Sequence, residues 1–64
     1  MDLTTKERID GMILEALGEN EKLINHALSL YQQTNLEIDL INLINLLMKK
    51  IRIGRMLNII ATIG

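Results

Sequence analysis

The 64-residue sequence contains no cysteine, no proline, no tryptophan and no phenylalanine. Without cysteine no disulfide can form, and a single histidine cannot supply the four ligands of a structural zinc site. A chain of this size buries only about 60% of the surface that its unfolded form exposes, so it is marginally stable alone. Small domains need a further source of stability, and this composition leaves association with another chain.

Few residues in the sequence interrupt a helix or favour a strand. Proline is absent and only four glycines occur. Valine, phenylalanine and tryptophan, which are enriched in strands, are absent as well. No linker of low complexity and no repeat divides the chain. The sequence therefore predicts a single all-α domain over residues 1–64.

The sequence carries no recognisable membrane or secretory segment. No stretch approaches the about 20 consecutive apolar residues of a membrane-spanning helix. A basic segment followed by an uninterrupted apolar run, as in a secretory signal, is also missing. We therefore expect a cytoplasmic protein. Binding at a membrane surface is disfavoured because tryptophan is absent and Asn42 and Asn45 weaken the apolar face.

Capping signals predict two short helices in the first half of the chain. Thr4 followed by Glu7 forms a capping box, and the apolar pattern that follows stops before Gly18, where a helix end is expected. Asn20 is placed to cap a second helix that extends to Gln33. The connection between them is short, so these helices are expected to be antiparallel neighbours, unless a single bent helix runs through both.

A longer third helix is predicted over residues 36–53. Thr34 and Glu37 repeat the capping-box spacing at its start. Gly54 either ends this helix or bends it. The apolar residues within 56–64 recur at helical spacing, which favours a short fourth helix or a continuation over a frayed tail.

The long helix is predicted to carry two apolar seams about 90° apart on its surface, with Asn42, Asn45, Lys49 and Arg52 on the other side. A helix with two seams needs two neighbours. The two short helices can cover one seam, and a second copy of the chain can cover the other. The predicted fold is a helical hairpin or small bundle completed by homodimerisation. Its interface residues are Leu40, Ile41, Leu43, Ile44, Leu47, Met48 and Ile51.

The charges are unevenly distributed along the chain. Residues 1–39 hold eight acidic and three basic residues, a net charge of −5, whereas residues 40–64 hold four basic residues and no acid, a net charge of +4. The basic group is a candidate site for anions or nucleic acid. No aromatic residue near it can stack on bases. The four basic residues are Lys49, Lys50, Arg52 and Arg55.

The sequence contains no pattern of catalytic, cofactor-binding or metal-binding residues. His26, the single imidazole, has no carboxylate three or four positions away to orient it. Glu15 and Glu19 are four residues apart, but they lie at the end of a predicted surface helix, where solvation explains them. No glycine-rich loop is present to bind phosphate. We therefore expect no enzymatic activity, no cofactor and no metal.

These observations favour a non-enzymatic helical protein–protein interaction module. It is expected to associate with itself and to act on another protein as a small regulator, inhibitor or chaperone-like adaptor. The uncovered seam can equally receive a helix of a different protein. The alternative is a small dimeric regulator that binds nucleic acid through the basic group at the end of the long helix.

Overall fold

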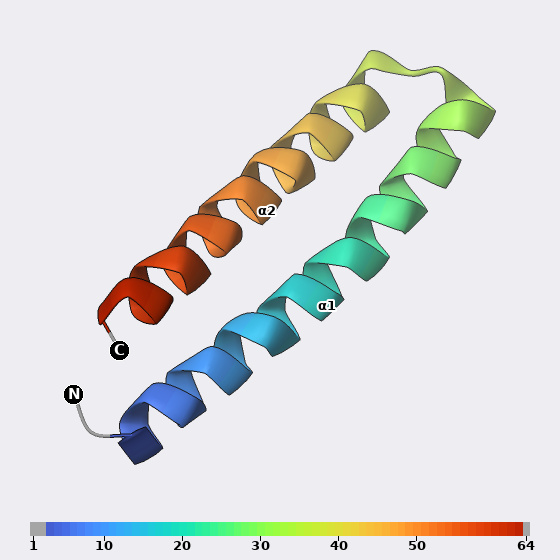
Figure 1. The fold of residues 1–64 in the computed structure, drawn as a ribbon. Coiled ribbons are helices and arrows are strands. Elements are labelled where there is room, and N and C mark those ends of the chain that lie inside the picture. Colours follow the sequence, from blue (N-terminus) through green and yellow to red (C-terminus); the bar gives the residue numbers. More distant parts are fainter. Residues whose placement is uncertain (1–2, 64) are drawn as a thin grey trace.

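The computed structural model describes residues 3–63, which form two antiparallel helices (Figure 1). Helix α1 spans Leu3–Thr34 and helix α2 spans Glu37–Ile63. Asn35 and Leu36 alone connect them, so the start of α1 and the end of α2 lie at the same end of the molecule. The all-α prediction is confirmed, because no strand occurs within residues 3–63.

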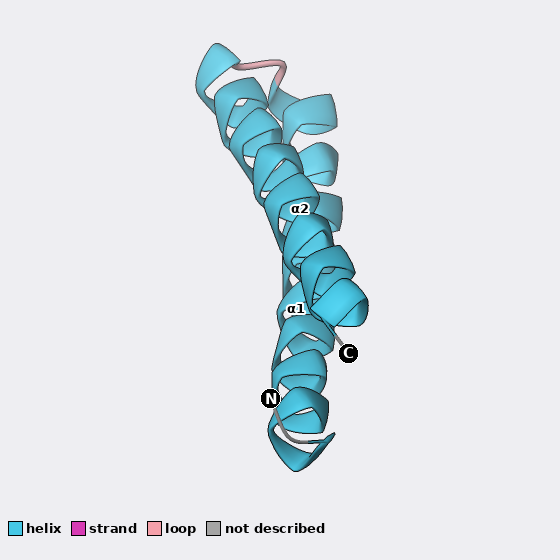
Figure 2. Cartoon of the chain, turned by 60° about the vertical axis from the view of Figure 1, so that its left-hand side comes forward, coloured by secondary structure: helices cyan, strands magenta, loops and turns pink. Residues whose placement is uncertain are grey.

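The hairpin is long and thin. Its principal extents are 48 × 15 × 11 Å, and its radius of gyration is 14.8 Å. A compact domain of this length has a radius of gyration of about 11 Å. Figure 2 shows α2 in front of α1, with no further described element on either face of the pair. Neither helix contains a stretch long and apolar enough to cross a membrane.

The prediction of two short helices before residue 34 is wrong, and the alternative of one helix through both segments is observed. Helix α1 continues through Gly18, and no described glycine has the positive φ of a helix end. Asn20 is 1% exposed and lies within the helix, so it is no N-cap. The reason is tertiary: Asn20 and Ile24 both lie on the face that α2 covers, and a break here would remove that contact.

Helix α2 also continues beyond its predicted end. Gly54 neither ends it nor adopts a left-handed conformation, and residues 56–63 extend the same helix. Leu57 and Ile60 are half-buried on the line of residues that faces α1. Packing against α1 thus stabilises the last two turns. Gly64 lies outside the described residues.

Helix α1 ends with a left-handed residue. Asn35 has a φ of 53°, and its backbone N–H donates a hydrogen bond of 2.8 Å to the carbonyl of Tyr31. This is the single bond of an αL C-cap. Asparagine tolerates the left-handed region better than most residues. Asn35 is therefore the left-handed residue at the helix end, a position predicted for Gly18.

The capping box predicted for Thr34 and Glu37 does not form at the start of α2. Thr34 is the last residue of α1, and its hydroxyl donates to the carboxylate of Asp39 rather than contacting Glu37. The same hydroxyl accepts a bond of 3.3 Å from the backbone N–H of Leu36. Asp39 lies in the first turn of α2, where a negative charge favours the helix macrodipole. The two hydrogen bonds of Thr34 therefore link the end of α1 to the connection and to the first turn of α2.

Apolar residues that recur three, four or seven positions apart line the contact between the helices, as in a coiled coil. Ile13, Ile24, Leu43 and Ile53 are each at most 9% exposed. Burial of four such side chains contributes about 6–12 kcal/mol before the loss of conformational entropy is subtracted. The core is therefore small for 64 residues. Half-buried residues extend it on both helices: Ile9, Leu17, Ala27, Tyr31, Leu46, Leu57 and Ile60.

Candidate interaction surface

The side of α2 that faces away from α1 carries a continuous run of apolar side chains. Five of its six residues are 42–58% exposed, and Leu40 is half-buried. No described residue of the hairpin covers this run, so water contacts most of it. We call this set the outer stripe: Leu40, Ile41, Ile44, Leu47, Met48 and Ile51.

Helical geometry explains why α1 cannot cover the outer stripe. Successive residues of a helix are about 100° apart, which places the six residues within an arc of about 120°. Leu46 and Ile53, which face α1, project from the opposite side of α2. Leu43 belonged to the predicted interface, but it is 8% exposed and is already covered by α1. The outer stripe therefore holds the other six residues of that prediction.

Exposed apolar residues on α1 do not form a comparable stripe. Met12 is 69% exposed, Leu14 58% and Leu23 50%. At 100° per residue, Met12 and Leu23 lie on one flank of α1, and Leu14 lies on the other. These three exposed residues of α1 therefore do not make a continuous surface like the outer stripe of α2.

The structure separates the four predicted basic residues into smaller groups. Arg52 and Arg55 border a shallow concavity of about 330 Å³ together with Met48 and Ile51, at the end of the outer stripe. Lys49 and Lys50 are exposed but point in other directions around the helix. The four residues therefore do not form one patch.

None of these four basic residues is neutralised within the described part of the chain. The ion pair within residues 3–63 joins Lys22 to Glu19 on α1, with 3.7 Å between Nζ and Oε1. Both of those side chains are largely exposed, so the pair contributes little to stability. The positive charges of α2 remain available to a partner.

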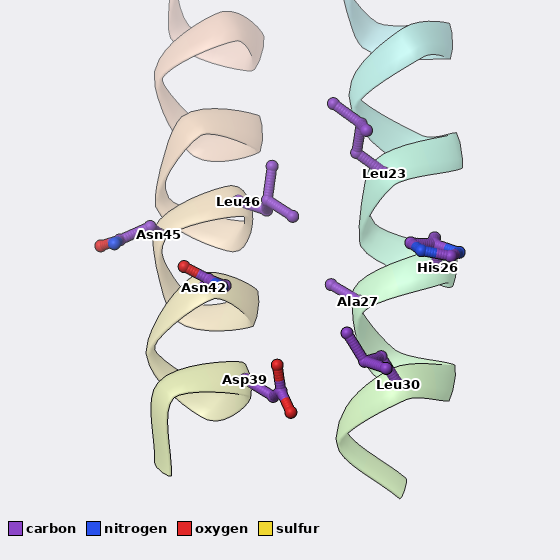
Figure 3. Close-up of a pocket in the computed structure, with 8 residues that line it drawn as sticks. All are labelled: Leu23, His26, Ala27, Leu30, Asp39, Asn42, Asn45 and Leu46. Atoms are coloured by element: carbon purple, nitrogen blue, oxygen red, sulfur yellow. The ribbon is translucent and has the colours of Figure 1, made fainter. Parts of the chain in front are cut away.

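A concavity of about 390 Å³ lies between the two helices and includes the single histidine in its lining (Figure 3). Leu23, Leu30 and Leu46 point into the space between the helices, whereas the exposed His26 points away from α2. No group of three or more histidine, aspartate or glutamate side chains within residues 3–63 is arranged to hold a metal ion.

Sequence reasoning missed two polar residues that the structure buries. Asn20 is 1% exposed and Asp39 is 8% exposed, and both lie on the faces where the helices meet. Their positions continue the three- and four-residue spacing of the core. That spacing is the signal in the sequence that identifies Asn20 and Asp39 as buried. Their polar side chains instead suggest a helix cap or a surface position.

The chain matches no protein-family model, and neither the curated proteins nor the solved structures include one that is similar to it.

Proposed function

We propose that this protein is a non-enzymatic helical interaction module that associates with itself through the outer stripe of α2. The exposed apolar surface of α2 carries this proposal, since contiguous apolar patches on soluble proteins mark interaction sites. Once assembled, the module acts on another protein as a small regulator, inhibitor or adaptor. Its cytoplasmic location is an expectation from the sequence alone.

The surface area of the hairpin supports a partner of substantial size. The chain has a mass of 7.3 kDa and exposes 4996 Å². A compact monomer of that mass exposes about 4,200 Å². The excess of about 800 Å² equals the surface that one partner contributes to a standard protein–protein interface. A dimer would bring the exposed surface of each chain close to that of a compact protein.

Replacement of Ile44 by aspartate tests the proposal. Ile44 lies in the middle of the outer stripe and is 45% exposed in the hairpin. Ile44→Asp would therefore disturb few contacts within the hairpin itself, but it would place an unpaired charge in the proposed interface. We expect the association constant, measured by sedimentation equilibrium, to fall at least about a hundredfold.

Met12→Asp is the matched control for this experiment. Met12 is 69% exposed on α1, outside the outer stripe, so the same chemical change there should leave association within a few-fold of the original. Equal effects of the two substitutions, or an Ile44→Asp variant that associates as strongly as the original protein, would refute the proposed surface.

A second candidate function is nucleic-acid binding by the basic residues of α2. The observation that favours it is the shared concavity of Arg52 and Arg55, neither of which forms an ion pair within residues 3–63. Such binding rests on phosphate neutralisation, so its affinity falls steeply with salt. A salt titration of binding to duplex DNA and to RNA, with Arg52→Gln and Arg55→Gln together as the control, tests it. Absence of binding at low salt removes this candidate.

A further inference from the structure

Two opposite charges lie at the two ends of the outer stripe, on the same side of α2. Glu37 begins the helix, and Arg55 follows it by 18 residues. Eighteen residues make five full helical turns, so both side chains project in the same direction about 27 Å apart. Both residues are exposed, and neither forms an ion pair within the described part of the chain.

This arrangement is self-complementary in one orientation. When two copies of α2 lie antiparallel about a two-fold axis at the level of Leu46, Glu37 of each copy faces Arg55 of the partner subunit. A parallel arrangement would instead place Glu37 against glutamate and Arg55 against arginine. Like charges at both ends would disfavour it. An isologous two-fold dimer is also the commonest assembly of soluble homo-oligomers.

We infer that the partner of the outer stripe is a second copy of this chain, docked with its α2 antiparallel and with a Glu37–Arg55 ion pair at each end of the interface. This inference rests on the proposed self-association and specifies its geometry. The apolar residues follow the same symmetry. Ile41 lies at the level of Ile51 of the partner subunit, and Ile44 at the level of Met48 of the partner subunit.

The two α2 helices then form the centre of the assembly. Each α2 is covered by its own α1 on the Leu46 side and by the other α2 on the opposite side. The charge pattern specifies the orientation, while the apolar residues between the two ends supply the favourable free energy. A helix of an unrelated protein would need the same charges in the reverse order at the same spacing.

Charge exchange at the two ends is the first part of the test. At low ionic strength, Glu37→Lys alone and Arg55→Glu alone should each weaken dimerisation about tenfold, because two attractive pairs become repulsive. The double variant Glu37→Lys/Arg55→Glu should restore affinity to within about threefold. Glu15→Lys changes the net charge by the same amount as Glu37→Lys, but residue 15 is on α1, so this control should leave the affinity unchanged. Single variants that dimerise like the original protein would overturn the inference.

Cross-linking is the second part and reports orientation directly. The chain has no cysteine, so Ile41→Cys and Ile51→Cys introduce one thiol each. In the antiparallel dimer, residue 41 of one copy lies about 15 Å along the helix axis from residue 41 of the other, too far for a disulfide. Mixing the two variants under thiol exchange should therefore give the mixed 41–51 disulfide, identified by tryptic peptide mapping, and little of either symmetric product.

The outcomes separate this inference from the proposed function. A dimer that forms symmetric 41–41 disulfides overturns the antiparallel geometry and leaves self-association intact. A chain that sediments as a monomer at every concentration overturns both. A dimer that forms the mixed 41–51 disulfide and responds to charge exchange supports both.

Discussion

The side-chain amide of Asn20 donates a hydrogen bond across the hairpin to the main-chain carbonyl of Leu46, with 3.3 Å between Nδ2 and O. Asn20 is 1% exposed, and its Oδ1 atom has no hydrogen-bond partner in the structure. A polar residue in an apolar helical seam lowers stability but fixes the register of the two helices. This bond therefore specifies which turn of α2 lies opposite the middle of α1.

Asn20→Leu should stabilise the hairpin. Leucine has nearly the same shape as asparagine and leaves no buried Oδ1 unsatisfied. We predict a gain of about 1 kcal/mol in the free energy of unfolding, seen as a higher Tm by circular dichroism at a fixed chain concentration. The control Asn20→Asp would bury a charge and should unfold the hairpin at a much lower temperature. A lower Tm for Asn20→Leu would show that the amide bond contributes net stability.

The hydroxyl of Thr34 should be needed where the two helices are joined. It accepts a hydrogen bond from the backbone of Leu36 and donates one to Asp39, which is 8% exposed. Thr34→Val keeps the shape and removes both bonds, at an expected cost of about 1–2 kcal/mol. Thr34→Ser retains the hydroxyl and should cost much less. Equal urea midpoints for the two variants would contradict this function of the hydroxyl.

Gly18→Ala distinguishes a continuous α1 from two shorter helices. A Cβ atom at Gly18 meets nothing within 4 Å, so alanine should stabilise a continuous helix by about 1 kcal/mol. If Gly18 instead ended a helix in the left-handed conformation, alanine would destabilise the protein by about that amount. Gly11→Ala, also inside α1 and also free of contacts, is the control and should stabilise in either case. Thermal unfolding of the two variants decides between the structures.

The sequence was sufficient to predict the helical class because its apolar residues recur at helical spacing and strand-favouring residues are missing. It was not sufficient to place the helix boundaries. Gly18 and Asn20 are the same local signals whether they end a helix or lie inside one. The choice depends on the contact of Asn20 with Leu46, a residue 26 positions away. Local capping signals contain no information about such a contact.

Spacing within α2 does not specify which of its apolar residues face α1. The apolar spacing predicts that residues 40–51 contact two neighbouring helices. Six of the seven predicted interface residues lie on the outer stripe. Leu46 is not among the seven predicted interface residues, yet it faces α1, and Leu43 is buried as well. Which residues face α1 is determined by the register that the connection at Asn35 and the amide of Asn20 impose, and periodicity within one helix does not specify it.

Self-association through the outer stripe is best tested by sedimentation equilibrium of the unmodified protein, with helicity followed by circular dichroism over the same range of concentrations. We expect a mass near twice 7.3 kDa and a loss of helicity as dilution separates the chains, because four buried apolar residues stabilise the separate hairpin only weakly. A fully helical monomer at every concentration would contradict the claim that a second copy covers the outer stripe.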